Sequence, residues 1–288
     1  MTHLLAIALQ SAWNRRHTLG LTLVAIALSV TLLLGIERLR NDARASFAEA
    51  VSGTDLVVGA RSGPLQLLLH AVFHLGEASN TLSWQSAQML ATHPAVAWTI
   101  PLSLGDSHRG FPVLGTTPAY FAHFQYGDRQ PLRLASGKPL INQPGAKTGT
   151  QAGGLFAVVL GAEVAARLGY KLGDRIVLAH GMHERDEEHH DEHHDAHDAE
   201  AEPGHAEHGD KPFTVVGILA RTGTPVDRTL HISLAGMEAL HVDWQNGVPA
   251  RGTGKVSAEQ ARAMDLQPKA ITAFLLGLNS KIDRKSVV

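Results

Sequence analysis

A run of nineteen residues without a charged side chain, from Thr18 to Ile36, is the feature that most constrains what this chain can form. An α-helix rises about 1.5 Å per residue, so a helix of this length covers most of a hydrocarbon core of about 30 Å. A helix also satisfies its own backbone hydrogen bonds, as lipid requires. The sequence therefore predicts a membrane anchor near the N-terminus, with a large domain behind it.

A cleaved signal peptide is the competing interpretation of this run. Its apolar region usually spans about 7–15 residues. The run in this chain is longer and begins only after seventeen residues, and the small-residue motif Ala43-Arg44-Ala45 lies beyond four charged residues. We therefore favour an uncleaved anchor. Arg15 and Arg16 favour a cytoplasmic N-terminus and a domain outside, although three arginines after the helix weaken this asymmetry.

The chain divides into three predicted parts. Residues 1–17 are predicted to form a cytoplasmic amphipathic helix, or alternatively an N-terminal extension of the next helix. Residues 18–36 are the transmembrane helix. Residues 37–288 are predicted to form the large domain outside the membrane, with a disordered insertion rich in His, Asp and Glu at about 181–211.

Charge and cysteine content exclude several classes of function. The formal net charge is −2, so the chain offers no broad basic surface for nucleic acid. It has no cysteine, which excludes a disulfide framework and any Cys-based zinc or thiol site.

Strand-like and helix-like segments alternate along the large domain, which predicts a mixed α+β fold. The strands Ala97–Leu104 and Phe111–Gly115 flank Gly105–Gly110, which we expect to be a long hairpin loop. A helix is predicted over Ala162–Leu168, ended by Gly169 in the left-handed region.

The histidine-rich insertion is the main candidate for a metal site. Nine of the eighteen histidines lie between His180 and His208, among acidic residues. We expect the insertion to be an expanded loop between the strands Arg175–Ala179 and Phe213–Ala220. Neutral imidazole binds zinc, copper and nickel, and tracts of this composition are typical of metal binding. The candidate Zn²⁺ ligands are His183, His189, His190, His193, His194, His197, His205 and His208. The alternative is a solvated loop that binds metal without fixed geometry.

Signals for catalysis are missing. His70 and His74 stand four residues apart, but no glutamate follows His70, so the metalloprotease motif is absent and two packed histidines are the better interpretation. The sequence contains neither a phosphate-binding loop of the Walker A type nor a G-x-S-x-G motif. We therefore assign no catalytic and no cofactor-binding residues, and we predict that the chain is not an enzyme.

Four phrases, in their order and spacing, carry a family resemblance. They are Ile100-Pro-Leu-Ser-Leu-Gly-Asp106, Leu114-Gly-Thr-Thr-Pro-Ala-Tyr-Phe121, Gly161-Ala-Glu-Val-Ala-Ala-Arg-Leu-Gly-Tyr-Lys-Leu-Gly-Asp174 and Phe213-Thr-Val-Val-Gly-Ile-Leu-Ala-Arg-Thr-Gly-Thr-Pro-Val-Asp227. With the N-terminal helices, the chain up to about Asn279 resembles FtsX/MacB-type permeases of ABC transport systems. The fold class implied is α+β, with one transmembrane helix followed by a periplasmic core of MacB type.

The resemblance implies a transport role in the bacterial inner membrane. Members of this family have four transmembrane helices, with the large domain between the first two. They work as homodimers in lipid on cytoplasmic ABC ATPase subunits, whose ATP hydrolysis moves the outer domain. No second apolar span follows here, so the later transmembrane helices are missing and we expect a truncated chain. Lipid, lipoprotein and peptide cargo are all compatible with the family.

Two other classes of function stay open. One is a single-span periplasmic metal-binding or adaptor protein, in which the histidine-rich insertion would be the working part. The other is a membrane-anchored hydrolase, which needs a nucleophile and a base in a geometry that the sequence does not indicate.

Overall fold

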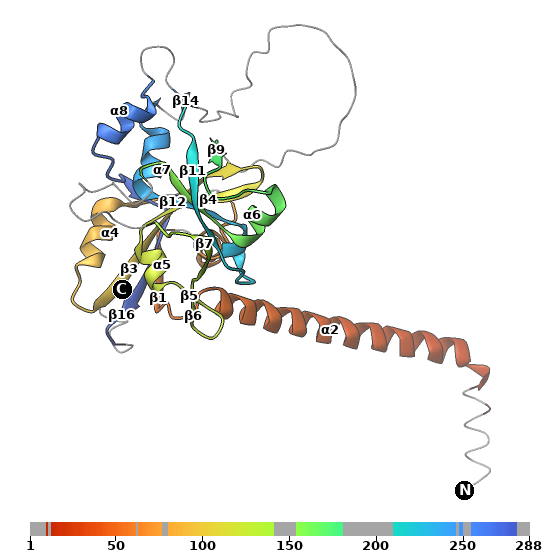
Figure 1. The fold of residues 1–288 in the computed structure, drawn as a ribbon. Coiled ribbons are helices and arrows are strands. Elements are labelled where there is room, and N and C mark those ends of the chain that lie inside the picture. Colours follow the sequence, from red (N-terminus) through yellow and green to blue (C-terminus); the bar gives the residue numbers. More distant parts are fainter. Residues whose placement is uncertain are drawn as a thin grey trace, which may run out of the picture. The chain divides into compact units, whose positions relative to one another are not determined.

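The computed structural model describes residues 10, 13–61, 63–76, 80–140, 154–180, 210–245, 248–249 and 255–280. The chain separates into two compact units, Met1–Ala48 and Glu49–Val288. Figure 1 shows a long helix in the first unit and a twisted sheet with surrounding helices in the second.

The helix α2 (Arg16–Ala50) contains the whole apolar run. Its stretch Arg16–Asn41 has a mean hydropathy of 2.5, and none of it is buried by the rest of the chain. In the described part of the sequence this is the one helix long and apolar enough to cross a membrane. Side chains such as Leu21 and Leu28 are about 70% exposed, an arrangement that suits lipid rather than water.

The second unit is built on a mixed sheet of ten strands. Eight strands follow the order β1-β16-β3-β4-β12-β8-β11-β7, while β10 adds to β3 and β9 adds to β11. The pairs β4–β12 and β8–β11 are parallel and the other pairs are antiparallel. In chain order the strands are β1 (Leu56–Gly59), β3 (Val96–His108), β4 (Phe111–Thr116), β7 (Leu134–Gly137), β8 (Ala157–Leu160), β9 (Arg175–Ile176), β10 (Ala179–His180), β11 (Phe213–Leu219), β12 (Leu230–Ser233) and β16 (Ala273–Leu278).

Short helices and three two-stranded pairs complete the described part of this unit. The helices are α3 (Pro64–Ala71), α4 (Trp84–Ala91), α5 (Ala119–His123), α6 (Ala162–Leu168), the 3₁₀ turn η1 (Pro225–Arg228), α7 (Leu234–His241) and α8 (Ala258–Ala263). The pairs are β2 (Leu82–Ser83) with β15 (Ala270–Ile271), β5 (Gln125–Tyr126) with β6 (Gln130–Pro131), and β13 (Trp244–Gln245) with β14 (Val248–Pro249). The mixed α+β class predicted from the alternation is confirmed.

The main core lies between the sheet and the helices α6, α7 and α8. It is formed by alternate residues of β8, β11 and β12 together with buried side chains of those helices, such as Val164, Leu240 and Ala261. Helix α7 begins where the Ser233 hydroxyl accepts a hydrogen bond from the Gly236 amide at 2.8 Å. This cap and the buried face of α7 fix the orientation of the helix, and so the position of His241 at its end.

The hairpin loop predicted at Gly105–Gly110 is wrong. Strand β3 runs through Gly105 to His108, and the turn consists of Arg109 and Gly110, whose φ values of 49° and 76° are typical of a tight hairpin. Gly105 lies at a bulge, where the register between β3 and β4 shifts between Leu104 and Asp106. Asp106 is therefore a buried strand residue and not part of a solvated loop.

The segments that flank the histidine-rich insertion begin as a hairpin and then diverge. Strand β9 pairs antiparallel with β11, with Ile176 opposite Phe213. Beyond it the chain turns to β10, which pairs with β3 and places His180 opposite Asp106. The predicted single strand Arg175–Ala179 is thus two short strands on different neighbours.

Gly161 provides a test of this packing. Its amide donates a hydrogen bond to the Thr229 carbonyl at 2.9 Å, and a Cβ here would collide with the backbone carbonyl oxygens of Val226 and Asp227. Backbone atoms cannot move as a side-chain end can, so we expect Gly161→Ala to lower the free energy of unfolding by about 1–3 kcal/mol. The measurement is thermal unfolding of the intact chain in detergent. Gly105→Ala is the matched control, because its Cβ would meet open space; equal melting temperatures for both variants would contradict the prediction.

Candidate functional site

The eight histidines predicted as zinc ligands, His183 to His208, lie outside the described residues. Their metal binding stays a prediction. The described part of the chain nevertheless contains a cluster at the point where the insertion begins.

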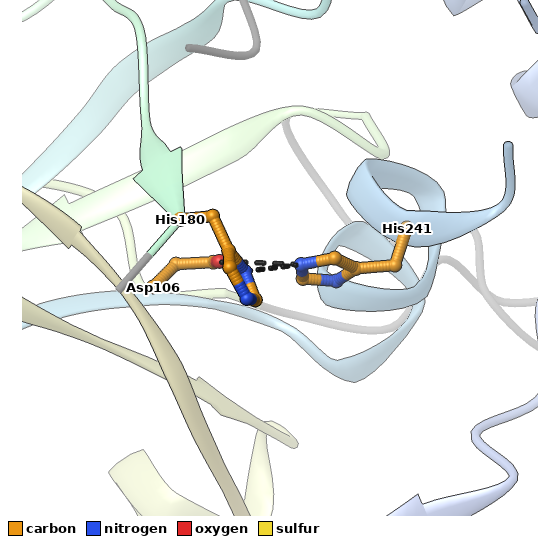
Figure 2. A group of neighbouring side chains, drawn as sticks. All are labelled: Asp106, His180 and His241. Atoms are coloured by element: carbon orange, nitrogen blue, oxygen red, sulfur yellow. Dashed lines mark hydrogen bonds and ion pairs between the residues drawn. The ribbon is translucent and has the colours of Figure 1, made fainter. Parts of the chain in front are cut away.

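Asp106, His180 and His241 form this cluster, which we call the Asp-His-His cluster. Figure 2 shows the three side chains pointing toward one another from strand β3, strand β10 and the end of helix α7. Asp106 and His180 are opposite residues of an antiparallel ladder, so their side chains share one face of the sheet. His241 reaches them from the last turn of α7.

The three ligand atoms nearly form an equilateral triangle. Asp106 Oδ1 lies 3.2 Å from His180 Nδ1 and 3.2 Å from His241 Nε2. The two ring nitrogens are 3.3 Å apart. Exposure differs across the cluster, because Asp106 is buried while the side chains of His241 and His180 are 27% and 43% exposed. The carboxylate thus lies at the base of the cluster, and the imidazoles lie between it and solvent.

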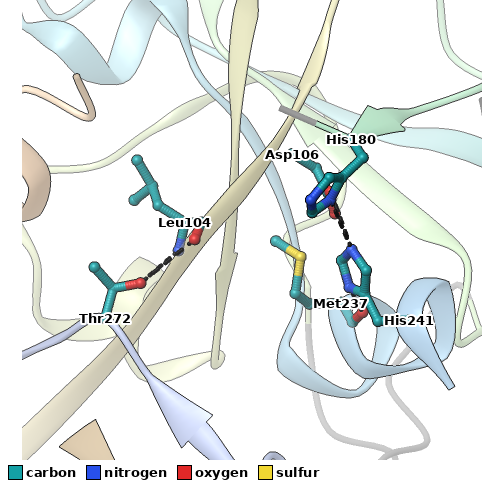
Figure 3. Close-up of polar contacts among 6 residues, drawn as sticks. All are labelled: Leu104, Asp106, His180, Met237, His241 and Thr272. Carbon is teal, nitrogen blue, oxygen red and sulfur yellow. Dashed lines mark hydrogen bonds and ion pairs between the residues drawn. The ribbon is translucent and has the colours of Figure 1, made fainter. Parts of the chain in front are cut away.

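Two neighbouring contacts hold these residues in place, as Figure 3 shows. The His241 Nδ1–H donates to the Met237 carbonyl at 3.0 Å, one turn earlier in α7. Next to the bulge, the Leu104 amide donates to the Thr272 hydroxyl at 3.0 Å. The Thr272 hydroxyl therefore pairs with a backbone amide of β3 at a position beyond the end of the β3–β16 ladder. This hydrogen bond supports the bulge next to Asp106.

Electrostatics favour positive charge on His241. Burial alone would lower the pKa of this imidazole, but the hydrogen bond and the negative charge of Asp106, with the Met237 carbonyl, outweigh burial and raise the pKa above its ordinary value. A buried carboxylate is costly unless a positive group compensates it. Either an imidazolium or a bound cation can supply that charge at this position.

The two ends of the insertion are both tied to the end of α7. At the start, His180 contacts His241. At the other end, Lys211 is 1% exposed, and its Nζ donates to Asp243 Oδ1 at 2.9 Å. Burial would raise the pKa of Asp243, but the hydrogen bond and charge of Lys211 and the Val256 amide lower it below the usual value.

His231, His74 and His70 are buried histidines outside the Asp-His-His cluster. His231 is completely buried, its Nδ1–H donates to the Val159 carbonyl at 3.3 Å, and its ring lies 5.1 Å from that of Tyr120. His74 is 2% exposed, and its Nδ1–H donates to the Thr229 hydroxyl at 2.8 Å. The His70 side chain is also buried. His70 and His74 thus pack inside the domain.

Of the three residues in the Asp-His-His cluster, only His180 lies at a segment that the sequence singles out for metal binding. His180 was the boundary of the histidine-rich insertion and not a predicted ligand. Asp106 lies in strand β3, within the segment that the sequence predicts to be a loop. His241 ends the short helix α7 and stands in no motif that marks it as a ligand. Strand alternation gives no signal for Asp106, because the bulge at Gly105 interrupts it between Leu104 and Asp106.

Comparisons with known proteins identify the family. The family model described as MacB-like periplasmic core domain matches residues 19–265, so the chain belongs to that family. This places it in the general class of ABC-type transporter permeases rather than among classical enzymes, and with helix α2 it indicates a membrane protein.

Two solved structures are similar to this chain. One is the periplasmic region of MacB from Actinobacillus actinomycetemcomitans, with 12% identity, 83% of each chain covered and a TM-score of 0.42. The other is the extracellular domain of the noncanonic ABC-type transporter YknZ from Gram-positive bacteria. It is 11% identical to this chain, with a TM-score of 0.37. The match covers 72% of this chain and 78% of the YknZ domain. A sequence search of curated proteins gives no match.

Proposed function

We propose that this chain is the membrane subunit, or permease, of an ABC-type export or mechanotransmission system. A separate cytoplasmic ABC ATPase binds and hydrolyses ATP, and helix α2 transmits the resulting movement to the domain outside. The observation that carries this proposal is the family match over residues 19–265, which includes both the apolar helix and most of the domain. The chain itself performs no chemistry in this scheme.

The proposal includes the place and the assembly of the protein. Residues 18–36, within helix α2, span the lipid of a bacterial inner membrane, and residues 37–288 lie in the periplasm. Two copies form a homodimer through their membrane segments. The exposed apolar side chains along α2 support contact with lipid or with another helix.

Electron paramagnetic resonance with one spin label per chain tests the coupling. The chain has no cysteine, so Met89→Cys on α4, where Met89 is 68% exposed, gives a single labelled position. Labelled protein is reconstituted in lipid with the ABC ATPase that co-purifies with it. We expect an inter-protomer distance that changes when a non-hydrolysable ATP analogue is added.

The control is the same ATPase with its phosphate-loop lysine replaced, which should abolish the change in distance. Failure of any ABC ATPase to co-purify would overturn the partner. An absent inter-protomer distance would overturn the homodimer, and a distance unchanged by nucleotide would overturn the coupling.

A link to zinc is the finer part of the proposal. Its support is the composition of the insertion, in which imidazoles and carboxylates alternate at close spacing. Titration of the intact chain with Zn²⁺ should reveal several equivalents that disappear when residues 183–208 are deleted. Equal stoichiometry in both chains would contradict metal binding by the insertion.

A further inference from the structure

We propose that Asp106 Oδ1, His180 Nδ1 and His241 Nε2 bind one Zn²⁺ ion, in a fixed site that does not need the histidines of residues 183–208. The site is independent of the transport role, since it requires only the described fold. Its ligand atoms come from strands β3 and β10 and from the end of helix α7.

The spacing of the ligand atoms matches one face of a zinc tetrahedron. Zn–N and Zn–O bonds are about 2.0–2.2 Å long, so the corners of a tetrahedron around zinc are about 3.3–3.5 Å apart. The three observed separations are 3.2, 3.2 and 3.3 Å. A single ion can therefore reach all three atoms with movements of a few tenths of an ångström, and the fourth position stays open to water or another ligand.

The orientation of the His241 ring favours a metal. A histidine that binds a metal through one ring nitrogen generally donates the other N–H to a carbonyl or carboxylate, which fixes the tautomer. His241 does this through Nδ1–H and the Met237 carbonyl. Its Nε2 then directs a lone pair toward Asp106 and His180, unless a second proton is added to the ring.

The donor set suits zinc better than calcium or magnesium. Two imidazoles and one carboxylate are a combination that Zn²⁺ uses in sites with three protein ligands, whereas Ca²⁺ and Mg²⁺ prefer oxygen alone. The two ring nitrogens are 3.3 Å apart, and their lone pairs would repel each other at that distance unless a positive charge lies close to both. A cation or a proton removes that repulsion.

The position of the site gives it a structural consequence. It joins three elements that are distant in sequence: strand β3, the strand β10 from which the insertion departs, and the end of α7. Lys211 and Asp243 tie the other end of the insertion to the same segment. Zinc bound here would fasten the base of the insertion to the core at the start of the histidine-rich segment.

The experiment uses the chain in detergent with only residues 183–208 deleted, so that His180 is kept. Zinc binding by the histidines of the insertion then does not contribute to the signal. Calorimetric titration with Zn²⁺ should show one saturable equivalent. His241→Ala should weaken binding at least about 100-fold, because losing even an outer-shell partner of a ligand costs about 10–100-fold. His123→Ala is the matched control, since His123 is exposed and stacks on Trp98, 5.3 Å away.

Two further measurements distinguish a metal site from a cluster in which protonated histidines alone compensate the carboxylate. Co²⁺ in place of zinc should give the intense visible bands of a four-coordinate ion in the deleted chain, which requires no ligand variant. Asp106→Asn, which keeps the side-chain shape, should lose the Zn²⁺-dependent rise in melting temperature while its melting temperature in chelator shows that it folds.

Several results would overturn the site. One is the absence of saturable binding in the deleted chain, which would assign all zinc binding to the insertion. Others are binding unchanged by both His241→Ala and Asp106→Asn, or weak six-coordinate Co²⁺ bands. Because the titration contains no ATPase, its failure would leave the permease proposal standing, and failure of the nucleotide experiment would leave the zinc site standing.

Discussion

Replacing Asp243 by alanine is expected to lower the free energy of unfolding by about 3–5 kcal/mol, because it leaves a buried ammonium without its main compensating charge. The Lys211 side chain is 1% exposed, and Asp243 Oδ1 lies 2.9 Å from its Nζ. Among the described residues, a second carboxylate, that of Asp210, is 3.8 Å from the same nitrogen and is itself 43% exposed. Asp243 Oδ2 also accepts a hydrogen bond from the Val256 amide, which the substitution removes. Thermal unfolding of the intact chain in detergent measures the loss.

A double variant separates the buried charge from the loss of packing. In Lys211→Met with Asp243→Leu, no charge remains to be buried, and such replacements are often neutral or stabilising. We therefore expect the double variant to be more stable than Asp243→Ala. If the double variant were less stable than the single one, the ion pair itself would be the stabilising element and the explanation by stranded charge would be wrong.

A surface ion pair supplies the matched control. Arg167 and Glu163 are 3.3 Å apart at positions i and i+4 of α6, with side chains 61% and 36% exposed. Exposed pairs of this kind contribute about 0–1 kcal/mol. Arg167→Ala should therefore change the melting temperature little. A similar loss in Arg167→Ala and Asp243→Ala would show that burial does not govern the effect.

Local signals predicted much of the secondary structure. Helix α6 has the predicted bounds, Ala162–Leu168, because glycines stand at both of its ends and Gly169 adopts the left-handed conformation at φ 71°. Strand β11 (Phe213–Leu219) ends one residue before the predicted end at Ala220, and its burial alternates with the strand period. The length and lack of charge of the apolar run predict a helix there. In the structure the run and the charged segment after it form a single helix.

The candidate site could not be predicted because its members meet only through the sheet topology. Asp106 and His180 are 74 residues apart, and His180 and His241 are 61 residues apart, so no spacing motif links them. A Gly-Asp-Ser sequence near a Gly is typical of a loop. Here the bulge at Gly105 and the two-residue turn keep that sequence in the strand, and only the neighbouring strand β10 shows why an aspartate stands there.

The same limit applies to the histidine composition of the chain. The density of histidines in residues 183–208 draws attention to metal binding, because composition is visible without a fold. It does not reveal that single histidines elsewhere have quite different environments. His231 is buried against aromatic rings, while His241 faces a carboxylate. The first must stay neutral in the folded chain, whereas the second is stabilised when charged.

Acid should therefore destabilise the folded domain strongly between pH 6.5 and 4. Burial lowers the pKa of His74 to about 4. Burial and then the nearby His74 lower the pKa of His231 to about 3, although the Val159 carbonyl opposes this. In the unfolded chain both imidazoles titrate near the ordinary value of about 6.5. The unfolded chain then binds more protons below that pH, so stability falls as the pH decreases and stops falling below the folded pKa values.

The expected size of this loss is large. One pKa unit corresponds to about 1.4 kcal/mol, so each of the two histidines destabilises the fold by about 2 kcal/mol at pH 5 relative to pH 7.5. Carboxylates such as Asp243, whose pKa is lowered, lose their contribution only at lower pH. The window from pH 7.5 to 5 therefore reports mainly on the histidines.

His231→Phe isolates one of the two. The substitution removes the titrating group and the hydrogen bond to the Val159 carbonyl while keeping an aromatic ring beside Tyr120 and Phe121. At pH 7.5 its melting temperature should stay close to that of the unchanged chain, and at pH 5 it should be the more stable of the two. His123→Phe, on the exposed surface, should keep the original pH dependence. If His231→Phe lost stability between pH 7.5 and 5 as steeply as the unchanged chain, proton uptake by His231 would not drive the acid sensitivity. The loss would then have to come from His74, because the raised pKa of His241 makes the Asp-His-His cluster more stabilising, not less, as the pH falls.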